Sequence, residues 1–254
     1  MTTQQQSPPS ILVVDDDEDT CRNLSDILSD RGYQVDTAFD GPSALALVHK
    51  HAYDVALLDY KMPGMTGLEL YREIKKARSG TVAVIVSAYT DASTRDEALG
   101  AGAWHVLSKP VDLSQLLGMV DEALGQPLVL VVDDDADLCL NLWDLLRERG
   151  YRVCLAHDAQ MGAERARERA HKVVLIDMRL PAGDGSEVFH AVREINPAAH
   201  TVLITGYRRE LGGLVEQVLN EGADAVCYKP FDVPALLATL DRLTKPEPSG
   251  QREV

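Results

Sequence analysis

The sequence predicts an α/β protein with two tandem (βα)5 domains, each a doubly wound parallel sheet of five strands with helices on both faces. Three observations lead to this prediction. Apolar runs such as residues 11–14 and 128–132 do not alternate with polar residues, which is typical of strands buried on both faces. Helical patterns separate these short runs, as parallel strands require. The whole succession occurs twice within 254 residues.

Turn and capping signals place each element of the first half. Gly32 ends the first helix, and Asp40-Gly41-Pro42 is a turn whose proline starts the second helix. The loop 60–67, rich in glycine and proline, separates the third strand from the third helix. The expected order is strand 11–14, helix 18–31, strand 33–39, helix 42–51, strand 55–58, helix 68–77, strand 81–86, helix 92–99, strand 104–107 and helix 113–124.

A constant offset in residue number relates the two halves. Most recurring features lie 118 residues apart and the last lies 120 apart, so the chain is a tandem duplication with two extra residues in its second half. Residues 208–219 therefore predict a longer helix than residues 92–99. The recurring features are Asp15 and Asp133, Cys21 and Cys139, Arg31-Gly32-Tyr33 and Arg149-Gly150-Tyr151, Asp59 and Asp177, Ser87 and Thr205, and Lys109 and Lys229. The expected organisation is a disordered start at 1–9, domains at 10–124 and 128–243, a linker at 125–127 and a polar tail at 244–254.

Composition and charge restrict the class of function. Hydrophobic residues make up 45% and charged residues 26% of the chain, so each half can bury a core. The net charge of −15, to which both halves contribute, argues against direct nucleic-acid binding, because neutralising phosphates needs a basic surface. The basic residues of segment 165–172 are interleaved with glutamates and predict a solvated helix face.

Apolar segments and cysteines indicate the compartment. No stretch is long and apolar enough to span a membrane, and the first ten residues lack the apolar core of a signal peptide. Four cysteines without a C-x-x-C pair indicate buried thiols in a reducing compartment. The seven histidines show no metal-ligand spacing, and we expect them at the surface. Together these features predict a soluble cytoplasmic protein.

Polar side chains follow several of the buried strands. In the first half these are the aspartate triplet 15–17, Asp59, Ser87 and Lys109. Right-handed crossovers bring the carboxyl ends of parallel strands to one edge of the sheet, so these side chains converge. Crowded carboxylates repel each other unless a cation lies between them, and Mg²⁺ suits oxygen ligands; the alternative for the triplet is a solvated helix N-cap. A carboxylate, Mg²⁺, a hydroxyl and an ammonium group suit phosphoryl transfer onto an aspartate.

Each half also carries the same set of short motifs at the ends of its strands. They are Val-Val-Asp-Asp after the first strand, Leu-Leu-Asp-Tyr-Lys-Met-Pro-Gly-Met-Thr-Gly and Leu-Ile-Asp-Met-Arg-Leu-Pro-Ala-Gly-Asp-Gly after the third, Val-Ser-Ala and Ile-Thr-Gly after the fourth, and Ser-Lys-Pro and Tyr-Lys-Pro after the fifth. With these motifs, residues 10–124 and 128–243 resemble CheY-like receiver domains of response regulators in two-component signalling. The resemblance implies the flavodoxin-like strand order 2-1-3-4-5. It also implies a phosphorylated signalling protein whose partners are a sensor histidine kinase or histidine phosphotransfer protein and a downstream protein.

The resemblance implies a role for each site residue. The phosphoacceptors are Asp59 and Asp177. The Mg²⁺ ligands are Asp16 and Asp134 directly, Asp15 and Asp133 through water, the two phosphoacceptors, and the backbone carbonyls of Lys61 and Arg179. The residues that bind the phosphoryl group are Ser87, Lys109, Thr205 and Lys229. Cis bonds are expected before Pro110 and Pro230, and helix N-caps at Asp17 and Asp135.

Two departures from the family concern its switch and its phosphate lifetime. Many receivers carry an aromatic switch residue three positions before the site lysine, where this chain has Val106 and Val226. Valine has no ring to swing in and out of a pocket. Bulky residues stand two positions after each phosphoacceptor and each hydroxyl residue, and we expect them to slow autodephosphorylation by blocking the attacking water. These residues are Lys61, Arg179, Tyr89 and Tyr207.

Other functions stay open at this point. One is a docking module in which one or both receivers work without phosphorylation, and another is the receiver fragment of a longer regulator or hybrid kinase. A phosphatase with an aspartate nucleophile would have a second acid two residues after the nucleophile. This chain has Lys61 and Arg179 there, which argues against that class. We expect no enzyme activity beyond self-catalysed phosphotransfer and autodephosphorylation, no direct nucleic-acid binding and no membrane insertion. The sequence also leaves open whether the chain forms a homodimer, because family members often dimerise through the side that carries the last helix.

Overall fold

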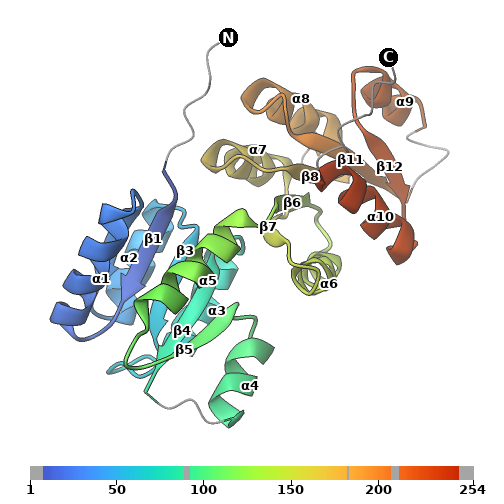
Figure 1. Ribbon diagram of the computed structural model, residues 1–254. Helices are drawn as coiled ribbons and strands as arrows, with labels where there is room; N and C mark the ends of the chain where they lie inside the picture. Colours follow the sequence, from blue (N-terminus) through green and yellow to red (C-terminus); the bar gives the residue numbers. More distant parts are fainter. Residues whose placement is uncertain (1–7, 89–91, 182, 207–211, 246–254) are drawn as a thin grey trace, which may run out of the picture. The chain divides into compact units, whose positions relative to one another are not determined.

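The computed structural model describes residues 8–88, 92–181, 183–206 and 212–245. It separates into two compact units, residues 1–126 and 127–254, which Figure 1 shows in blue to green and in yellow to red. Each unit contains one five-stranded parallel sheet with helices packed on it. Among the described residues, no helix has the length and apolar character needed to cross a membrane.

The first unit alternates strand and helix five times, as the sequence predicts. Its sheet has the order β2-β1-β3-β4-β5, which confirms the expected order 2-1-3-4-5. The elements are β1 (Ser10–Val14), α1 (Glu18–Asp30), β2 (Gln34–Ala38), α2 (Gly41–Lys50), β3 (Val55–Asp59), α3 (Gly67–Ala77), β4 (Val82–Ser87), α4 (Ala92–Gly100), β5 (His105–Ser108) and α5 (Leu113–Gly125).

The second unit repeats this topology and adds a short hairpin. Its sheet has the order β7-β6-β8-β11-β12, the same as that of the first unit. The antiparallel pair β9 (Arg179–Leu180) and β10 (Gly183–Asp184) follows β8 and was not expected from the sequence. The other elements are β6 (Leu128–Val132), α6 (Ala136–Arg147), β7 (Arg152–Ala156), α7 (Ala159–Glu168), β8 (Val173–Asp177), α8 (Gly185–Ile195), β11 (His200–Thr205), α9 (Gly212–Asn220), β12 (Ala225–Tyr228) and α10 (Val233–Thr244).

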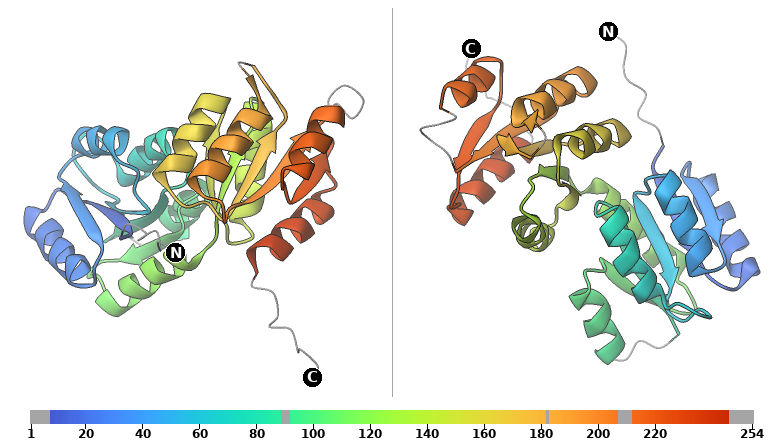
Figure 2. Two further views of the ribbon diagram at one scale, coloured as in Figure 1. Left: turned by 90° about the horizontal axis from the view of Figure 1, so that it is seen from above. Right: turned by 180° about the vertical axis from the view of Figure 1, so that it is seen from behind.

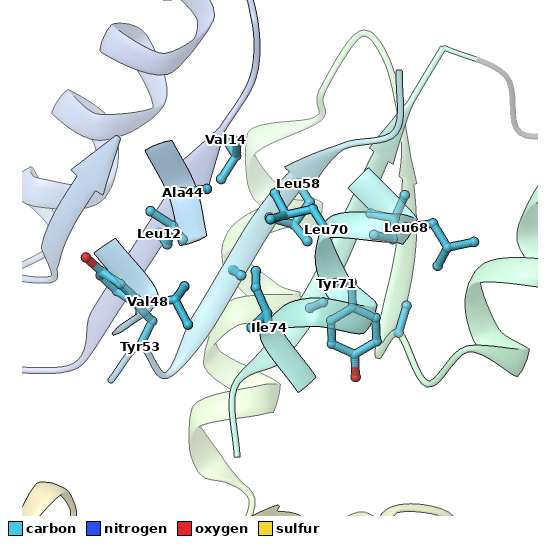
Figure 3. Packing of buried hydrophobic residues seen from close by; sticks show 14 of the residues in the cluster. Leu12, Val14, Ala44, Val48, Tyr53, Leu58, Leu68, Leu70, Tyr71 and Ile74 are labelled. Carbon is cyan, nitrogen blue, oxygen red and sulfur yellow. The ribbon is translucent and has the colours of Figure 1, made fainter. Parts of the chain in front are cut away.

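Helices cover both faces of each sheet, which explains the non-alternating apolar strands. In β1, Leu12 and Val14 pack with residues of α2, α3 and α4, whereas Ile11 and Val13 pack with residues of α1 and α5. All four side chains are at most 1% exposed. Figure 3 shows the first of these two clusters, and Figure 2 shows the helix layers from two further sides. Burying each such side chain contributes about 1.5–3 kcal/mol, so both layers stabilise the sheet.

Capping residues begin and end the first helix of each unit where the sequence predicts. The side chain of Asp17 accepts the amides of Asp19 and Thr20, and Asp135 accepts the amide of Leu138, which confirms both N-caps. Gly32 follows α1 with a φ of +88°, a conformation that glycine adopts without strain. The expected longer helix at 208–219 begins outside the described residues, because 207–211 are not described; α9 covers Gly212–Asn220.

Two expectations about the segment 165–172 are wrong. Helix α7 ends at Glu168, so the segment is not one helix face. His171 is 3% exposed rather than at the surface, because it lies just before the buried strand β8 and its carbonyl accepts a hydrogen bond from Asn196. Burial lowers the pKa of the His171 imidazole to about 3.

Candidate functional site

The carboxyl ends of four strands present the polar residues singled out in the first unit. Asp15 follows β1, Asp59 ends β3, Ser87 ends β4 and Lys109 follows β5. The parallel strands bring together residues that are 94 positions apart in the sequence. In the second unit, the corresponding residues after or at the ends of β6, β8, β11 and β12 are Asp133, Asp177, Thr205 and Lys229.

A lysine bridges two buried carboxylates in the first unit. The Nζ atom of Lys109 lies 2.5 Å from Oδ1 of Asp59 and 2.8 Å from Oδ2 of Asp15. The remaining oxygens accept backbone amides: Asp17 N–H donates to Asp15 Oδ1 and Lys61 N–H donates to Asp59 Oδ2, both at 3.0 Å. Asp15 and Asp59 are 4% and 6% exposed, so these hydrogen bonds replace most of their hydration.

The second unit builds the same arrangement from the corresponding residues. Lys229 Nζ lies 2.5 Å from Oδ2 of Asp177 and 2.7 Å from Oδ2 of Asp133. Asp135 N–H donates to Asp133 Oδ1 at 3.0 Å, and Arg179 N–H donates to Asp177 Oδ1 at 2.9 Å. In both units, one carboxylate oxygen of the strand-end aspartate therefore pairs with a lysine, and the other oxygen accepts a backbone amide.

Burial and ion pairing act in opposite directions on these groups. Burial raises the pKa of the Asp59 carboxyl above its usual value, and the pairing with Lys109 offsets only part of this. Burial raises the pKa of Asp133 in the same way. For Lys109 and Lys229, burial lowers the pKa, but hydrogen bonds to the two aspartates outweigh it and raise the pKa overall. Each lysine therefore stays cationic beside the carboxylates.

A third carboxylate completes a cluster with the chemistry of a cation site. Carboxylate oxygens of Asp15, Asp16 and Asp59 lie within 4.8 Å of one another, and Asp16 is the exposed member. The same relationship holds in the second unit for Asp133, Asp134 and Asp177. All-oxygen donor sets of this kind fit hard divalent cations, so the residues present suit Mg²⁺.

The two hydroxyl residues lie at strand ends, and a proline follows each site lysine. Ser87 and Thr205 are buried at the ends of β4 and β11. Their carbonyl oxygens accept the amides of Lys109 and Lys229 at 2.8 Å and 2.9 Å, which ties each hydroxyl residue to its lysine. The bonds that follow these lysines, Lys109-Pro110 and Lys229-Pro230, are cis as expected.

The residues at the switch position pack into the cores. Val106 lies on β5 beside Ile85 and is 4% exposed, and Val226 lies on β12 beside Leu203 and is half-buried. Neither position offers an aromatic ring. Tyr89 and Tyr207, two of the bulky residues that depart from the family, lie outside the described residues.

Two pairs of site residues were given no role from the sequence. Gly67 and Gly185 approach the backbone of Asp59 and Asp177 so closely that a Cβ atom would overlap the carbonyl oxygen. The thiols of Cys21 and Cys139 donate hydrogen bonds to the carbonyl oxygens of Asp15 and Asp133. The members of each pair are the same residue type and lie 118 positions apart. This repetition was the signal in the sequence that could have identified them.

Comparison with known proteins identifies the family of this chain. The family model of the response regulator receiver domain matches residues 11–121 and 129–241. A response regulator receiver protein of Anaeromyxobacter sp. (strain Fw109-5) is 33% identical over 225 residues, which are 89% of this chain and 91% of that protein. The transcriptional regulatory protein ZraR of Escherichia coli (strain K12) is 38% identical over 114 residues, 45% of this chain and only 25% of ZraR.

A solved structure is similar to just under half of the chain. The structure of the chemotaxis protein CheY4 of Vibrio cholerae is 31% identical with a TM-score of 0.44, covering 46% of this chain and 98% of CheY4. The family match covers most of the chain and falls once on each unit. The chain therefore belongs to the response regulator receiver family of two-component signalling, with one receiver domain in each unit.

Proposed function

We propose that each unit accepts a phosphoryl group on an aspartate in a Mg²⁺-dependent reaction and signals through the proteins that bind it. The phosphoacceptors are Asp59 and Asp177. The donor is the phosphohistidine of a sensor kinase or of a phosphotransfer protein, and a downstream protein receives the signal. The observation that carries the proposal is the short contact between each strand-end aspartate and its lysine, 2.5 Å in both units, next to two further carboxylates.

Each residue has a distinct part in the proposed reaction. One carboxylate oxygen of Asp59 attacks phosphorus, a P–O bond forms, and the bond from phosphorus to the donor nitrogen breaks. Before the reaction Lys109 pairs with Asp59. Once the phosphoryl group is attached, Lys109 pairs with the phosphoryl oxygens. The Lys61 amide keeps the second Asp59 oxygen in place, so the attacking oxygen is oriented. Ser87, at the end of the neighbouring strand, donates its hydroxyl to the phosphoryl group.

The acidic cluster provides the cation site for this reaction. Asp16 and Asp59 would hold Mg²⁺ directly, Asp15 would hold it through water, and the carbonyl of Lys61 would add a ligand. Bound Mg²⁺ supplies positive charge for the phosphoryl oxygens. In the second unit the corresponding set is Asp134, Asp177, Asp133 and Arg179. The cytoplasm is the proposed location, because both donor classes present their phosphohistidine there.

A docking module is the second candidate function. The aliphatic residues Val106 and Val226 favour it, since neither can report phosphorylation by reorienting a ring. In that case one or both units would bind a partner without being phosphorylated. Complete acceptor sets in both units support the phosphorylation proposal over this alternative.

Intact-mass spectrometry after incubation with Mg²⁺ and a small acyl phosphate tests the proposal. The full chain gains two phosphoryl groups, the variants Asp59→Asn and Asp177→Asn gain one each, and the double variant gains none. EDTA abolishes every gain. A chain that gains none, or a double variant that still gains phosphate, overturns the proposal. If the full chain gains one phosphoryl group and only one of the two single variants loses it, the unit whose aspartate was not needed is assigned the docking function.

A further inference from the structure

The buried thiols under the two acidic clusters make the same contact. Cys21 lies in the first turns of α1, and its Sγ atom is 3.4 Å from the carbonyl oxygen of Asp15 and 3.7 Å from that of Ala38. In the second unit, Cys139 Sγ is 3.2 Å from the carbonyl oxygen of Asp133. The two side chains are 1% and 0% exposed. Each thiol therefore donates its proton inside the protein rather than to water.

In the first unit, the carbonyl group that the thiol contacts lies outside the hydrogen bonds of the helix; in the second unit, His157 Nδ1 also lies 3.3 Å from the carbonyl oxygen of Asp133. The ladder of α1 starts with the amide of Cys21 donating to Asp17, so the carbonyl of Asp15 precedes it. Every other polar atom of Asp15 is held: its amide donates to Ala38 at 3.3 Å, and its carboxylate accepts Asp17 N–H and Lys109. The thiol thus provides the remaining constraint on this aspartate.

The cysteine is kept between the two units although both residues beside it in the chain change. Thr20, Arg22 and Ser25 of α1 correspond to Leu138, Leu140 and Trp143 of α6. An apolar filler at this position would need only volume, and Ala or Val would supply it. A residue that combines apolar character with a weak donor is what the carbonyl contact requires.

We propose that Cys21 and Cys139 are positioning residues, whose thiols orient Asp15 and Asp133 so that the acidic clusters bind Mg²⁺ productively. This inference rests on the proposed function for the identity of the cation. Removing a contact that orients a metal-site residue weakens cation binding, and one weak hydrogen bond corresponds to roughly a three- to tenfold loss of affinity. The cation tested is Mg²⁺ itself.

Calorimetric titration of the full chain with Mg²⁺ tests this inference. The Asp134→Asn background weakens the second site, so that the first unit is read alone. Cys21→Ala is expected to lower the Mg²⁺ affinity roughly three- to tenfold, and Cys21→Ser, which keeps a donor, is expected to restore most of it. Leu28→Ala, on the same buried face of α1 but away from the acidic loop, is expected to lower stability without changing the affinity.

The order of the variants separates positioning from packing. If the thiol only fills space, Ser binds Mg²⁺ no better than Ala, or Cys21→Ala binds as tightly as the parent; either result overturns the inference. Circular dichroism confirms that each variant is folded at the titration temperature. Phosphorylation of the parent by an acyl phosphate is scored separately, so failure of the proposed function stays distinguishable from failure of the positioning role.

Discussion

Gly67 lies directly against the backbone of Asp59. A Cβ atom on Gly67 would overlap the carbonyl oxygen of Asp59 and come within 3.0 Å of its carbonyl carbon. Gly185 stands in the same relation to Asp177. The glycine begins α3 or α8, so the loop after each acceptor strand folds back onto the residue that starts it. The close approach, not a left-handed backbone, is what requires glycine here.

Substituting this glycine tests how rigidly the acceptor is held. Gly67→Ala is expected to destabilise the first unit by about 1–3 kcal/mol and to suppress phosphorylation of Asp59, because the added methyl displaces the acceptor backbone. Urea denaturation and intact mass measure the two effects. Gly118→Ala, at an exposed α5 position with open space around it, is the control and should be neutral or stabilising by about 1 kcal/mol. A Gly67→Ala protein with unchanged stability and phosphorylation would contradict the close approach.

Removing the cation should lower stability. Because Mg²⁺ would bind the folded cluster of Asp15, Asp16 and Asp59 and not the unfolded chain, we expect Mg²⁺ at a hundredfold excess over its Kd to stabilise the folded unit by about 2.7 kcal/mol. Denaturation in EDTA and in Mg²⁺ measures this difference. Asp16→Asn combined with Asp134→Asn should abolish most of it. Asp19→Asn, an exposed acid of α1 outside the cluster, should leave it unchanged, and equal losses in both variants would argue for non-specific screening.

High pH should weaken the hydrogen bond between Tyr33, which precedes β2, and Asp121 of α5. The hydroxyl of Tyr33 donates to Asp121 at 2.6 Å, and burial together with this carboxylate raises the pKa of Tyr33 to about 12. Since the folded pKa exceeds the unfolded value, this stabilisation is present below about pH 10 and is lost as the pH rises towards 12. Tyr33→Phe should lower the unfolding free energy at pH 8 by roughly 0.5–1 kcal/mol and flatten its decline at alkaline pH. An equally steep decline in the variant would refute the assignment.

The acyl phosphate should persist once formed. Lys61 and Arg179 follow the acceptors by two residues with exposed side chains, and we expect them, with Tyr89 and Tyr207, to hinder the attacking water. Mass spectrometry after removal of the phosphodonor measures the decay in each single-acceptor variant. Lys61→Ala should shorten the lifetime in the first unit, whereas Lys50→Ala, an exposed lysine of α2, should not. Half-lives of only seconds in both units would rule out this protection.

Much of the fold and of the site follows from the sequence by itself. Apolar runs, caps such as Asp17, turn residues such as Gly32 and the offset of 118 are local or periodic signals, and they determined the (βα)5 succession and its duplication. Strand ends marked by Asp15, Asp59, Ser87 and Lys109 identified the candidate site, because parallel strands place their carboxyl ends at one edge. The helix ending at Glu168 and the buried His171 were missed, since periodicity is weak at helix ends.

Only the tertiary structure decided which atoms meet. The bridge from Lys109 to Asp15 and Asp59, the glycine under Asp59, the thiol beneath Asp15 and the pair of Tyr33 with Asp121 all join residues from different elements. Their distances depend on strand register and helix packing, which no local pattern in the sequence encodes. The sequence therefore determined which chemical groups are available, and the packing of helices on the sheets determined how those groups are held.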